Sequence, residues 1–163
     1  MKWRKPVIIG SILCTLLIVL CIQLYVYIHK DEWIAKRQLI DIAFAESELM
    51  HVNRSTYSYG EETLGIVYGE DERDDPMLVM IMDQKVVDSF RISELYAEER
   101  VKADVRTAYP DEIIIRIQPS KKNGAYVWEV YSKKKVNQQT SYAYHYYHLE
   151  SGIYIDTYKL GSR

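Results

Sequence analysis

The stretch that best defines the fold is residues 123–134, NGAYVWEVYSKK, in the second half of the chain. Its opening Asn-Gly pair is a strong signal for a tight turn between two strands. The residues that follow alternate in polarity, and side chains two apart on a strand share one face. Trp128 and Val130 are therefore predicted to point into a core, whereas Glu129 and Tyr131 point outward. The stretch predicts an antiparallel sheet with one covered face and one open face.

Before this strand, a helix is predicted over residues 94–108. Ser93 is a favourable N-cap, an apolar stripe is formed by Val101, Val105 and Ala108, and Pro110 ends the helix. Short runs of strand-forming residues, separated by turn signals, complete the second half. These predicted strands lie at residues 112–117, 126–131, 141–149 and 153–158.

The first half of the chain repeats this order, although the two halves share few identical letters. A helix is predicted within residues 30–50, where Trp33, Ile40 and Phe44 form an apolar stripe with Ala43 beside them. An offset of 61 residues places the last two large residues of this stripe on the two valines of the second helix. The strands predicted to follow lie at residues 56–59, 63–68, 77–82 and 86–90. The predicted fold class is α+β, with two small domains that each pack a helix on an antiparallel meander sheet.

Ahead of both halves, residues 7–28 read VIIGSILCTLLIVLCIQLYVYI and contain no charged side chain. As a helix these 22 residues would extend about 33 Å, enough to cross the hydrocarbon core of a bilayer. A buried core helix and a cleaved signal peptide are the alternatives. The run lacks the small-residue cleavage site of a signal peptide, and no small residue precedes Cys14 or Cys21 as lipoprotein processing would require. We expect an uncleaved, single-pass membrane anchor.

The residues before this anchor predict its orientation. Lys2, Arg4 and Lys5 precede it, and a positively charged flank favours the cytoplasmic side. Trp3 on the same side suits the aromatic belt of the membrane interface. We therefore expect the N-terminus in the cytoplasm and the later part of the chain outside the cell. The predicted organisation is a cytoplasmic tail (residues 1–6), the transmembrane helix (7–28), a first domain (29–91) and a second domain (92–163).

Composition limits the classes of function that the exterior part can have. Three of the 21 Lys and Arg precede the anchor, so 18 face the 23 Asp and Glu that follow it, a net charge of −5. This balance gives no drive toward nucleic acid. Both cysteines lie inside the anchor, which excludes a disulfide framework and a cysteine-based zinc site in the remainder of the chain.

Few residues suggest catalysis or metal binding. His145 and His148 are three apart, so on a strand they would point to opposite faces, and they are interpreted as surface histidines. Residues 70–75 are acidic but lack the glycine and closing glutamate of an EF-hand loop, which favours a solvated loop over a calcium site. Residues 133–140 are predicted as a long, solvated loop. No Gly-x-Ser-x-Gly, P-loop or dinucleotide fingerprint occurs, so no catalytic, cofactor-binding or metal residue is predicted.

Tyrosine is the most unusual part of the composition, with 15 residues, seven of which lie from Tyr131 to Tyr158. Tyrosine combines an apolar ring with a polar tip and is common in protein interfaces. On the last strand Ile153 and Ile155 are expected to face the helix, which leaves Tyr154 and Tyr158 on the open face. We predict a partner-binding surface of Tyr131, Tyr154 and Tyr158. The alternative is that the two domains pack these faces against each other.

Two segments resemble a known family: residues 125–134 (AYVWEVYSKK) and residues 141–160 (SYAYHYYHLESGIYIDTYKL). The chain resembles the TseB-like (YpmB) cell-wall elongation regulators of Gram-positive bacteria. The resemblance lies in the basic tail, the single membrane helix, a strand with Trp-Glu-Val and a hairpin closed by a turn of a small residue and glycine. That family has tandem cystatin-like domains, of which the second is PepSY-like. Residues 76–82 depart from the pattern because they lack the aromatic residues expected there. The resemblance implies a non-enzymatic, bitopic protein that works with a class B penicillin-binding protein in lateral wall growth.

Three functions follow as hypotheses. The first is a membrane-anchored extracellular regulator or adaptor of peptidoglycan synthesis, with a penicillin-binding transpeptidase as its partner. The second is a PepSY-type modulator or inhibitor of a surface protease. The third, an enzyme with a pocket between helix and sheet, is disfavoured because no nucleophile, acid–base pair or metal set converges in the sequence. No cofactor, nucleic acid or small-molecule substrate is expected.

Overall fold

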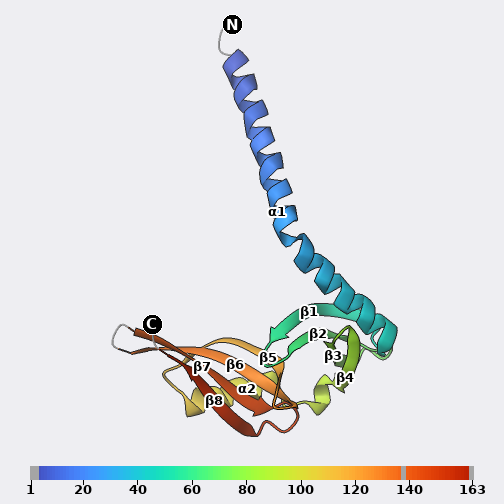
Figure 1. Cartoon of the computed structure of the whole chain (residues 1–163), viewed down its shortest axis with the longest axis vertical. Helices are drawn as coiled ribbons and strands as arrows, with labels where there is room; N and C mark the ends of the chain where they lie inside the picture. Colours follow the sequence, from blue (N-terminus) through green and yellow to red (C-terminus); the bar gives the residue numbers. More distant parts are fainter. Residues whose placement is uncertain (1–3, 137–138, 162–163) are drawn as a thin grey trace. The chain divides into compact units, whose positions relative to one another are not determined.

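The computed structural model describes residues 4–136 and 139–161. Its helices are α1 (Arg4–Glu46), the short 3-10 helix η1 (Ile92–Glu94) and α2 (Glu98–Ala108). Two four-stranded antiparallel sheets follow one another along the chain (Figure 1). The first contains β1 (His51–Tyr59), β2 (Thr63–Glu70), β3 (Pro76–Met82) and β4 (Lys85–Arg91), and the second β5 (Ile113–Lys122), β6 (Ala125–Val136), β7 (Gln139–His148) and β8 (Tyr154–Leu160). The predicted α+β class, with an apolar N-terminal helix before two antiparallel meanders, is confirmed.

After Gly10, helix α1 continues without a break to Glu46, because no glycine or proline occurs between Gly10 and Gly60. Its large apolar side chains from Leu13 to Ile28 are 43–78% exposed, so this part is not a buried core helix. The helix is long and apolar enough to cross a membrane. The predicted anchor lies within it, whereas Lys2 and Trp3, which contribute to the predicted orientation, lie outside the described residues.

The first sheet has the strand order β1-β2-β3-β4 and buries both of its faces. On one face, Val67 and Val79 pack with Leu39 and Ala43 from the last turns of α1. Gly65 permits this close approach, because a Cβ at that position would lie 2.3 Å from Leu39 Cδ2. Continuous apolar strands such as β3 are typical of sheets that are covered on both sides.

The buried face of the C-terminal part of α1 differs from the prediction. The sequence predicted a stripe of Trp33, Ile40 and Phe44, but Trp33 is 48% and Phe44 45% exposed, while Leu39 and Ala43 are buried. The physical reason is that the sheet has a glycine, Gly65, where Leu39 packs, so the face of α1 that carries Leu39 and Ala43 is the one that is buried. The predicted stripe is therefore wrong for Trp33 and Phe44, while Ile40 is half-buried and Ala43 is buried.

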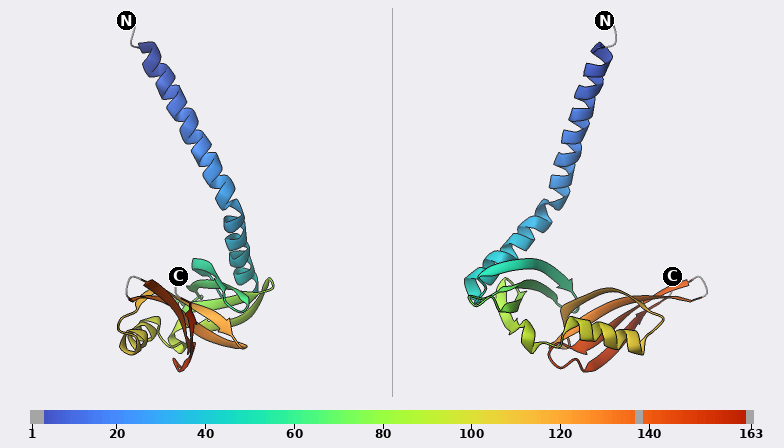
Figure 2. Two further views of the ribbon diagram at one scale, coloured as in Figure 1. Left: turned by 60° about the vertical axis from the view of Figure 1, so that its left-hand side comes forward. Right: turned by 180° about the vertical axis from the view of Figure 1, so that it is seen from behind.

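The second sheet has the order β5-β6-β7-β8 and carries α2 across one face (Figure 2). Val101 and Val105 of α2 are buried in one cluster with Trp128, Val130 and Tyr147 of the sheet. The inward direction of the tryptophan and valine on β6 is therefore confirmed, as are the two valines of the predicted helix stripe, whereas Ala108 is exposed. The two residues of the β5–β6 turn, Asn and Gly, have φ of 50° and 78°, the left-handed conformation that a two-residue hairpin requires.

A single hydrophobic cluster joins the two sheets. Ile66 and Met80, on the second face of the first sheet, belong to the same buried cluster as Trp128. Residues Leu39–Arg163 accordingly form one compact unit. The domain boundary predicted after residue 91 falls between β4 and η1, and the division into two domains stays a prediction.

Helix α2 begins later than predicted because the sheet holds the preceding segment. The backbone N–H of Tyr96 donates to Leu149 O at 3.0 Å, and its carbonyl accepts the indole N–H of Trp128 at 2.8 Å. These two hydrogen bonds keep the chain out of the helix until Glu98. Ser93, the predicted N-cap, lies instead inside η1.

The long loop predicted at residues 133–140 is wrong, because β6 and β7 continue into this segment. Lys135 pairs with Thr140 across the two strands. Lys134 forms an ion pair with Asp111 at 2.9 Å. A polar composition therefore marks exposed strands here rather than a loop, since both faces of this end of the hairpin carry polar side chains.

Candidate functional site

The candidate site is the face of the second sheet that lies opposite α2, which we call the open face. Residues directly opposite one another on paired strands share a face, and the pairs Arg116–Tyr131 and Gln118–Glu129 define it on β5 and β6. The same rows continue across β7 and β8. The open face carries Arg116, Gln118, Ser120, Lys122, Glu129, Tyr131, Tyr142, Tyr144, Tyr146, Asp156 and Tyr158.

Four tyrosine rings form a stack on this face. Tyr131 lies 4.8 Å from Tyr144 and 5.6 Å from Tyr142 between ring centroids, and Tyr144 lies 6.5 Å from Tyr146. All three pairs are close to parallel, with interplanar angles of 14–24°. Burial, followed by the neighbouring tyrosines, raises the pKa of Tyr131 above its ordinary value. Tyr131, at the centre of the stack, is therefore uncharged at neutral pH.

Tyr131 and Tyr158 lie on the open face as predicted, but Tyr154 does not. A bulge between β7 and β8 places Tyr154 opposite Tyr147, and Asp156 opposite Tyr146, so Ile155 is an extra residue. Tyr154 consequently contacts Tyr147 on the α2 side, with ring centroids 5.6 Å apart. The predicted alternation along β8 is wrong because the extra residue of the bulge moves the side chains that precede it to the opposite face of the sheet.

The same bulge overturns the expectation that two isoleucines face the helix. Ile153 is 67% and Ile155 40% exposed. Tyr144 and Tyr146, which the sequence reasoning did not select, take the place of Tyr154 on the open face. Their signal was present in the run YAYHYY, where residues 142, 144 and 146 are tyrosines at the spacing of one strand face.

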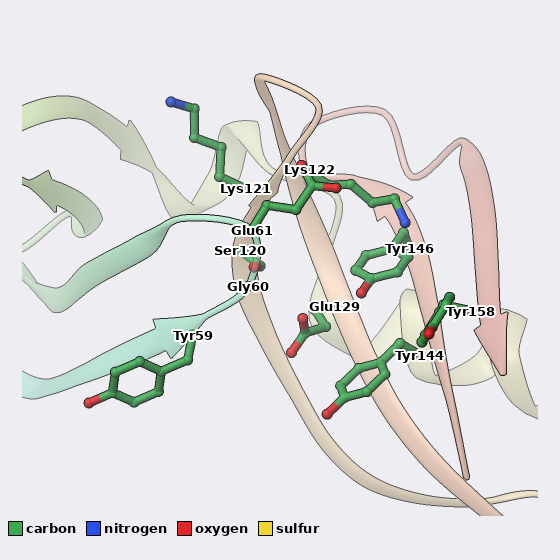
Figure 3. Close-up of a pocket in the computed structure, with 10 residues that line it drawn as sticks. All are labelled: Tyr59, Gly60, Glu61, Ser120, Lys121, Lys122, Glu129, Tyr144, Tyr146 and Tyr158. Atoms are coloured by element: carbon green, nitrogen blue, oxygen red, sulfur yellow. The ribbon is translucent and has the colours of Figure 1, made fainter. Parts of the chain in front are cut away.

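A cavity of about 280 Å³ opens on this face beside the tip of the β1–β2 hairpin (Figure 3). Its floor includes Glu129, which is only 4% exposed. The Glu129 carboxylate accepts hydrogen bonds from Arg116 at 3.1 Å and from Gln118 at 3.3 Å. Gln118 also donates to Ser58 Oγ at 3.0 Å, so a side chain of the first sheet completes this buried polar network. The cavity is lined by Tyr59, Gly60, Glu61, Ser120, Lys121, Lys122, Glu129, Tyr144, Tyr146 and Tyr158.

The tip of the β1–β2 hairpin forms one wall of the cavity and is fixed by hydrogen bonds to the second sheet. Glu61 accepts the backbone N–H of Asn123 at 2.7 Å. Lys121 donates to Glu62 at 2.8 Å, a contact that raises the pKa of Lys121. These contacts join residues that are about sixty positions apart in sequence, so the wall exists only in the folded chain.

The opposite wall combines a cation with an aromatic ring. The Lys122 ammonium points to the Tyr146 ring (Figure 3) and lies 3.8 Å from its centroid. The same ammonium lies 3.5 Å from Asp156 Oδ2. Such a cation–π contact is worth about 0.5–2 kcal/mol, depending on how dry the site is. Burial, and next the negative charge of Glu129, raises the pKa of Tyr146 to about 12. The phenol therefore stays protonated and can donate or accept a hydrogen bond.

A second polar cluster lies on the α2 side and corrects the interpretation of His145 as a surface residue. His145 is fully buried, with Nε2 2.7 Å from Glu112 Oε2 and Nδ1 2.8 Å from Thr157 Oγ1. Ser132 Oγ lies 3.1 Å from His145 Nε2 and also donates to Glu112. Sequence reasoning missed this burial because the neighbouring Tyr109, stacked on the ring, comes from outside the strand.

The geometry of this cluster is not that of a serine nucleophile. In a Ser–His–acid relay the acid and the serine contact different nitrogens of the imidazole. Here Glu112 and Ser132 contact the same nitrogen, Nε2. The cluster therefore satisfies buried polar groups, and it does not activate the Ser132 hydroxyl through His145.

The acidic residues 70–75 form a compact turn. Asp71 accepts the backbone N–H groups of Arg73 at 2.8 Å and of Asp75 at 3.0 Å, and these bonds lower its pKa. Asp74 has φ of 61°, the left-handed conformation tolerated by aspartate in tight turns. Within residues 4–136 and 139–161, no group of three or more His, Cys, Asp or Glu is arranged to hold a metal ion.

Comparison with known proteins gives one finding about the fold. The solved structure of the YpmB protein from Bacillus subtilis matches with a TM-score of 0.65 at 18% sequence identity, covering 76% of this chain and 96% of the other. At this identity the match shows a shared fold, which supports the YpmB part of the predicted resemblance. No model of a protein family and no curated protein matches this chain.

Proposed function

We propose that this chain, which has a YpmB-like fold, is a membrane-anchored extracellular regulator or adaptor of peptidoglycan synthesis. Its partner would be a class B penicillin-binding protein that acts in lateral wall elongation, the partner implied by the family resemblance of the sequence. The observation that carries the proposal is the open face, where the tyrosine stack borders Tyr158, which is 59% exposed. This surface lies in a chain whose N-terminal helix is able to cross a membrane.

The chemistry of the open face suits a protein partner. Aromatic rings with polar tips contribute much of the energy of protein interfaces because they bury large area while keeping a hydrogen bond. Around the rings, Arg116 is paired with Glu129 and Lys122 with Asp156. A partner would therefore meet an aromatic centre with charged pairs beside it, without having to neutralise an isolated buried charge.

The anchor makes a weak contact sufficient. In the proposed arrangement residues 7–28 cross the membrane, the N-terminus is cytoplasmic and residues 29–163 lie outside. Confining both proteins to one membrane surface raises their effective concentration, so an interface of modest affinity can be occupied. A regulator that acts by contact rather than turnover also agrees with the arrangement of Glu112, Ser132 and His145, which is not that of a serine nucleophile.

Site-specific cross-linking of the full chain in a Gram-positive host tests the proposal. A photo-reactive phenylalanine analogue placed at Tyr158 should capture a class B penicillin-binding transpeptidase, which mass spectrometry would identify. The matched control is the same analogue at Tyr154, which is also exposed but lies on the α2 side. That position should yield little or none of the same product.

Two other results would redirect the proposal. Capture of a surface protease at Tyr158 would favour the alternative of a protease modulator. If the transpeptidase is captured equally from both tyrosines, or only while residues 7–28 are the native anchor, the contact is not on the open face.

A further inference from the structure

A cavity of about 430 Å³, separate from the one on the open face, lies where the end of α2 meets the start of β8. Tyr154 is 48% exposed, so its ring is accessible to a ligand, whereas Tyr147 is 4% exposed and belongs to the floor. Ligand sites commonly combine such aromatic walls with a few polar groups. The cavity is lined by three aromatic rings, one carboxylate and two small residues: Tyr109, Tyr147, Tyr154, Asp104, Ala108 and Gly152.

The aromatic walls are held in place before any ligand binds. The Oγ1 atom of Thr157 lies 3.2 Å from the hydroxyl of Tyr109 and accepts a hydrogen bond from the hydroxyl of Tyr154 at 3.0 Å. The rings of Tyr147 and Tyr154 are inclined at 72°, with centroids 5.6 Å apart, so they form a corner rather than a flat surface. Side chains that are already positioned lose less conformational entropy when a ligand binds.

Asp104 gives the cavity a negative charge. Its Oδ2 accepts a hydrogen bond from the hydroxyl of Tyr96 at 2.8 Å, and Tyr96 packs so closely on Gly152 that a Cβ there would lie 2.4 Å from Tyr96 Cδ1. Its Oδ1 accepts no hydrogen bond from a described residue. Among these residues only Ser120 has a buried side-chain polar atom without a partner, so Asp104 Oδ1 is accessible to a ligand. Arg100, one turn earlier, forms no ion pair with Asp104 but lies 6.0 Å from the centroid of the Tyr96 ring.

The end of α2 makes the cavity more negative. Ala108 is the last residue of the helix, and the C-terminal end of a helix carries a partial negative charge. Arg106, in the same turn, is exposed and does not line the cavity. Burial, followed by Tyr109 and the negative charge of Asp104, raises the pKa of Tyr147 to about 12, so this ring stays neutral. An anion would be repelled here, whereas a cation would be attracted by the carboxylate, the helix end and the tyrosine rings.

We propose that this cavity binds an organic ammonium cation. Such a cation combines a positive charge, which suits Asp104 and the end of α2, with methyl or methylene groups that suit the tyrosine rings. A metal ion such as Ca²⁺ or Mg²⁺ fits less well, because these ions require several oxygen ligands and Asp104 is the one carboxylate among the described residues that line the cavity. The inference does not depend on the transpeptidase partner, since this cavity lies on the α2 side of the second sheet.

The test measures binding of choline and n-butylammonium to the full chain in a maltoside detergent, which itself carries no ammonium group. Saturation-transfer NMR titrations should show that at least one of the two binds. Their neutral counterparts are n-butanol and the analogue of choline with carbon in place of nitrogen. The counterpart of a ligand that binds should bind about fivefold more weakly or less, because it lacks the charge. The tighter ligand identifies the head group as primary or quaternary, and either result supports the proposal.

Two variants locate the site. Asp104→Asn keeps an acceptor for Tyr96 but removes the charge, and should weaken cation binding about fivefold or more. Tyr154→Leu keeps an apolar side chain but removes the ring, and should weaken binding of the cation more than that of its neutral counterpart. Glu98→Gln is the matched control, because it removes the same charge from an exposed position at the other end of α2. This control should bind as the unmodified chain does, and thermal unfolding shows that each variant is folded.

Three results would overturn the proposal. The first is an absence of binding for both ammonium ions. The second is equal binding of an ammonium ion and its neutral counterpart, which would mean that the cavity selects an apolar group and not a charge. The third is equal weakening by Asp104→Asn and Glu98→Gln, which would reduce the binding to a general attraction between a cation and an acidic protein.

Discussion

The two sheets share the same meander order but differ in what covers them. The first sheet is buried on both faces, by the end of α1 on one side and by the cluster shared with the second sheet on the other. The second sheet is covered by α2 on one face, whereas its open face meets only the β1–β2 hairpin among the described residues and carries the tyrosine stack. The comparison teaches that one architecture can serve as a structural platform in one copy and as a candidate binding surface in the other.

Sequence composition accounts for this difference. Strand β3 reads PMLVMIM, an apolar run whose five central residues are buried irrespective of the face they point to. Strand β7 reads QTSYAYHYYH and alternates between half-buried tyrosines and buried residues such as Ala143 and His145. A continuous apolar run requires cover on both faces, whereas alternation leaves one face available.

The largest expected effect comes from Leu78→Ala in the first sheet. Leu78 is fully buried in the cluster shared by both sheets, and such a truncation costs about 2–5 kcal/mol. In urea unfolding, the midpoint should move to lower urea by the same amount whether it is followed by the fluorescence of Trp128, in the second sheet, or by far-UV circular dichroism. Val87→Ala, at an exposed position of β4, is the control and should change stability by about 0.5 kcal/mol or less. A shift in circular dichroism without a shift in fluorescence would mean that the two sheets unfold independently.

A smaller loss of stability is expected when a larger side chain crowds the contact between α1 and the first sheet. Gly65→Val would push a side chain into Leu39, at a cost of about 1–3 kcal/mol. Hydrogen exchange of the Ala43 amide should accelerate, while amides of the second sheet should change less. Gly161→Ala, where an added Cβ would meet nothing within 4 Å, should leave exchange unaltered. Equal acceleration in both sheets would show that α1 is not a local cover of the first sheet.

A loss of stability at alkaline pH is expected from the ionisation of Tyr146 on the open face. Burial raises the pKa of Tyr146 to about 12, from an ordinary value near 10, so the fold favours the neutral phenol. Its contribution to stability is therefore complete below about pH 10 and is lost as the pH rises from about 10 to 12. Tyr146→Phe should flatten the fall in melting temperature over this window, whereas Tyr59→Phe, at a 77% exposed ring, should not. An identical fall for both variants would contradict the assignment.

The smallest effect on stability is expected at the candidate binding surface itself. Tyr158→Ser should change the free energy of unfolding by about 0.5 kcal/mol or less, because the ring is largely exposed. Tyr147→Ser, on the covered face of the same sheet, should cost about 3 kcal/mol or more, because that ring is buried in the core. Chemical denaturation of the two variants measures both values. Similar costs would mean that the open face is a structural interface instead of a binding surface.

The sequence was sufficient for most elements of the second half because local signals agree there. Asn-Gly supplied the turn, Pro110 the helix end, and Val101 with Val105 the helix stripe. The errors arose where a nonlocal contact outweighed a local preference. Hydrogen bonds of Tyr96 with Leu149 and Trp128 delayed α2, and the packing of Leu39 against a glycine of the first sheet decided which face of α1 is buried.

The candidate site was accessible from the sequence only in part. Tyr131 and Tyr158 could be assigned to the open face because strand periodicity is a local property. Tyr154 could not, because a bulge depends on the pairing partner and leaves no mark in the composition of β8.

Periodicity and composition alone determined the apolar N-terminal helix, the two antiparallel meanders and the enrichment of tyrosine in the second of them. The folded chain determined the cavity, because its walls come from a hairpin tip and a sheet about sixty residues apart. It also determined that Glu129 is buried on a face predicted to be open and that Ser120 lacks a partner. The physical reason is that alternation specifies which way a side chain points, whereas burial and hydrogen-bond partners depend on which distant segment packs above it.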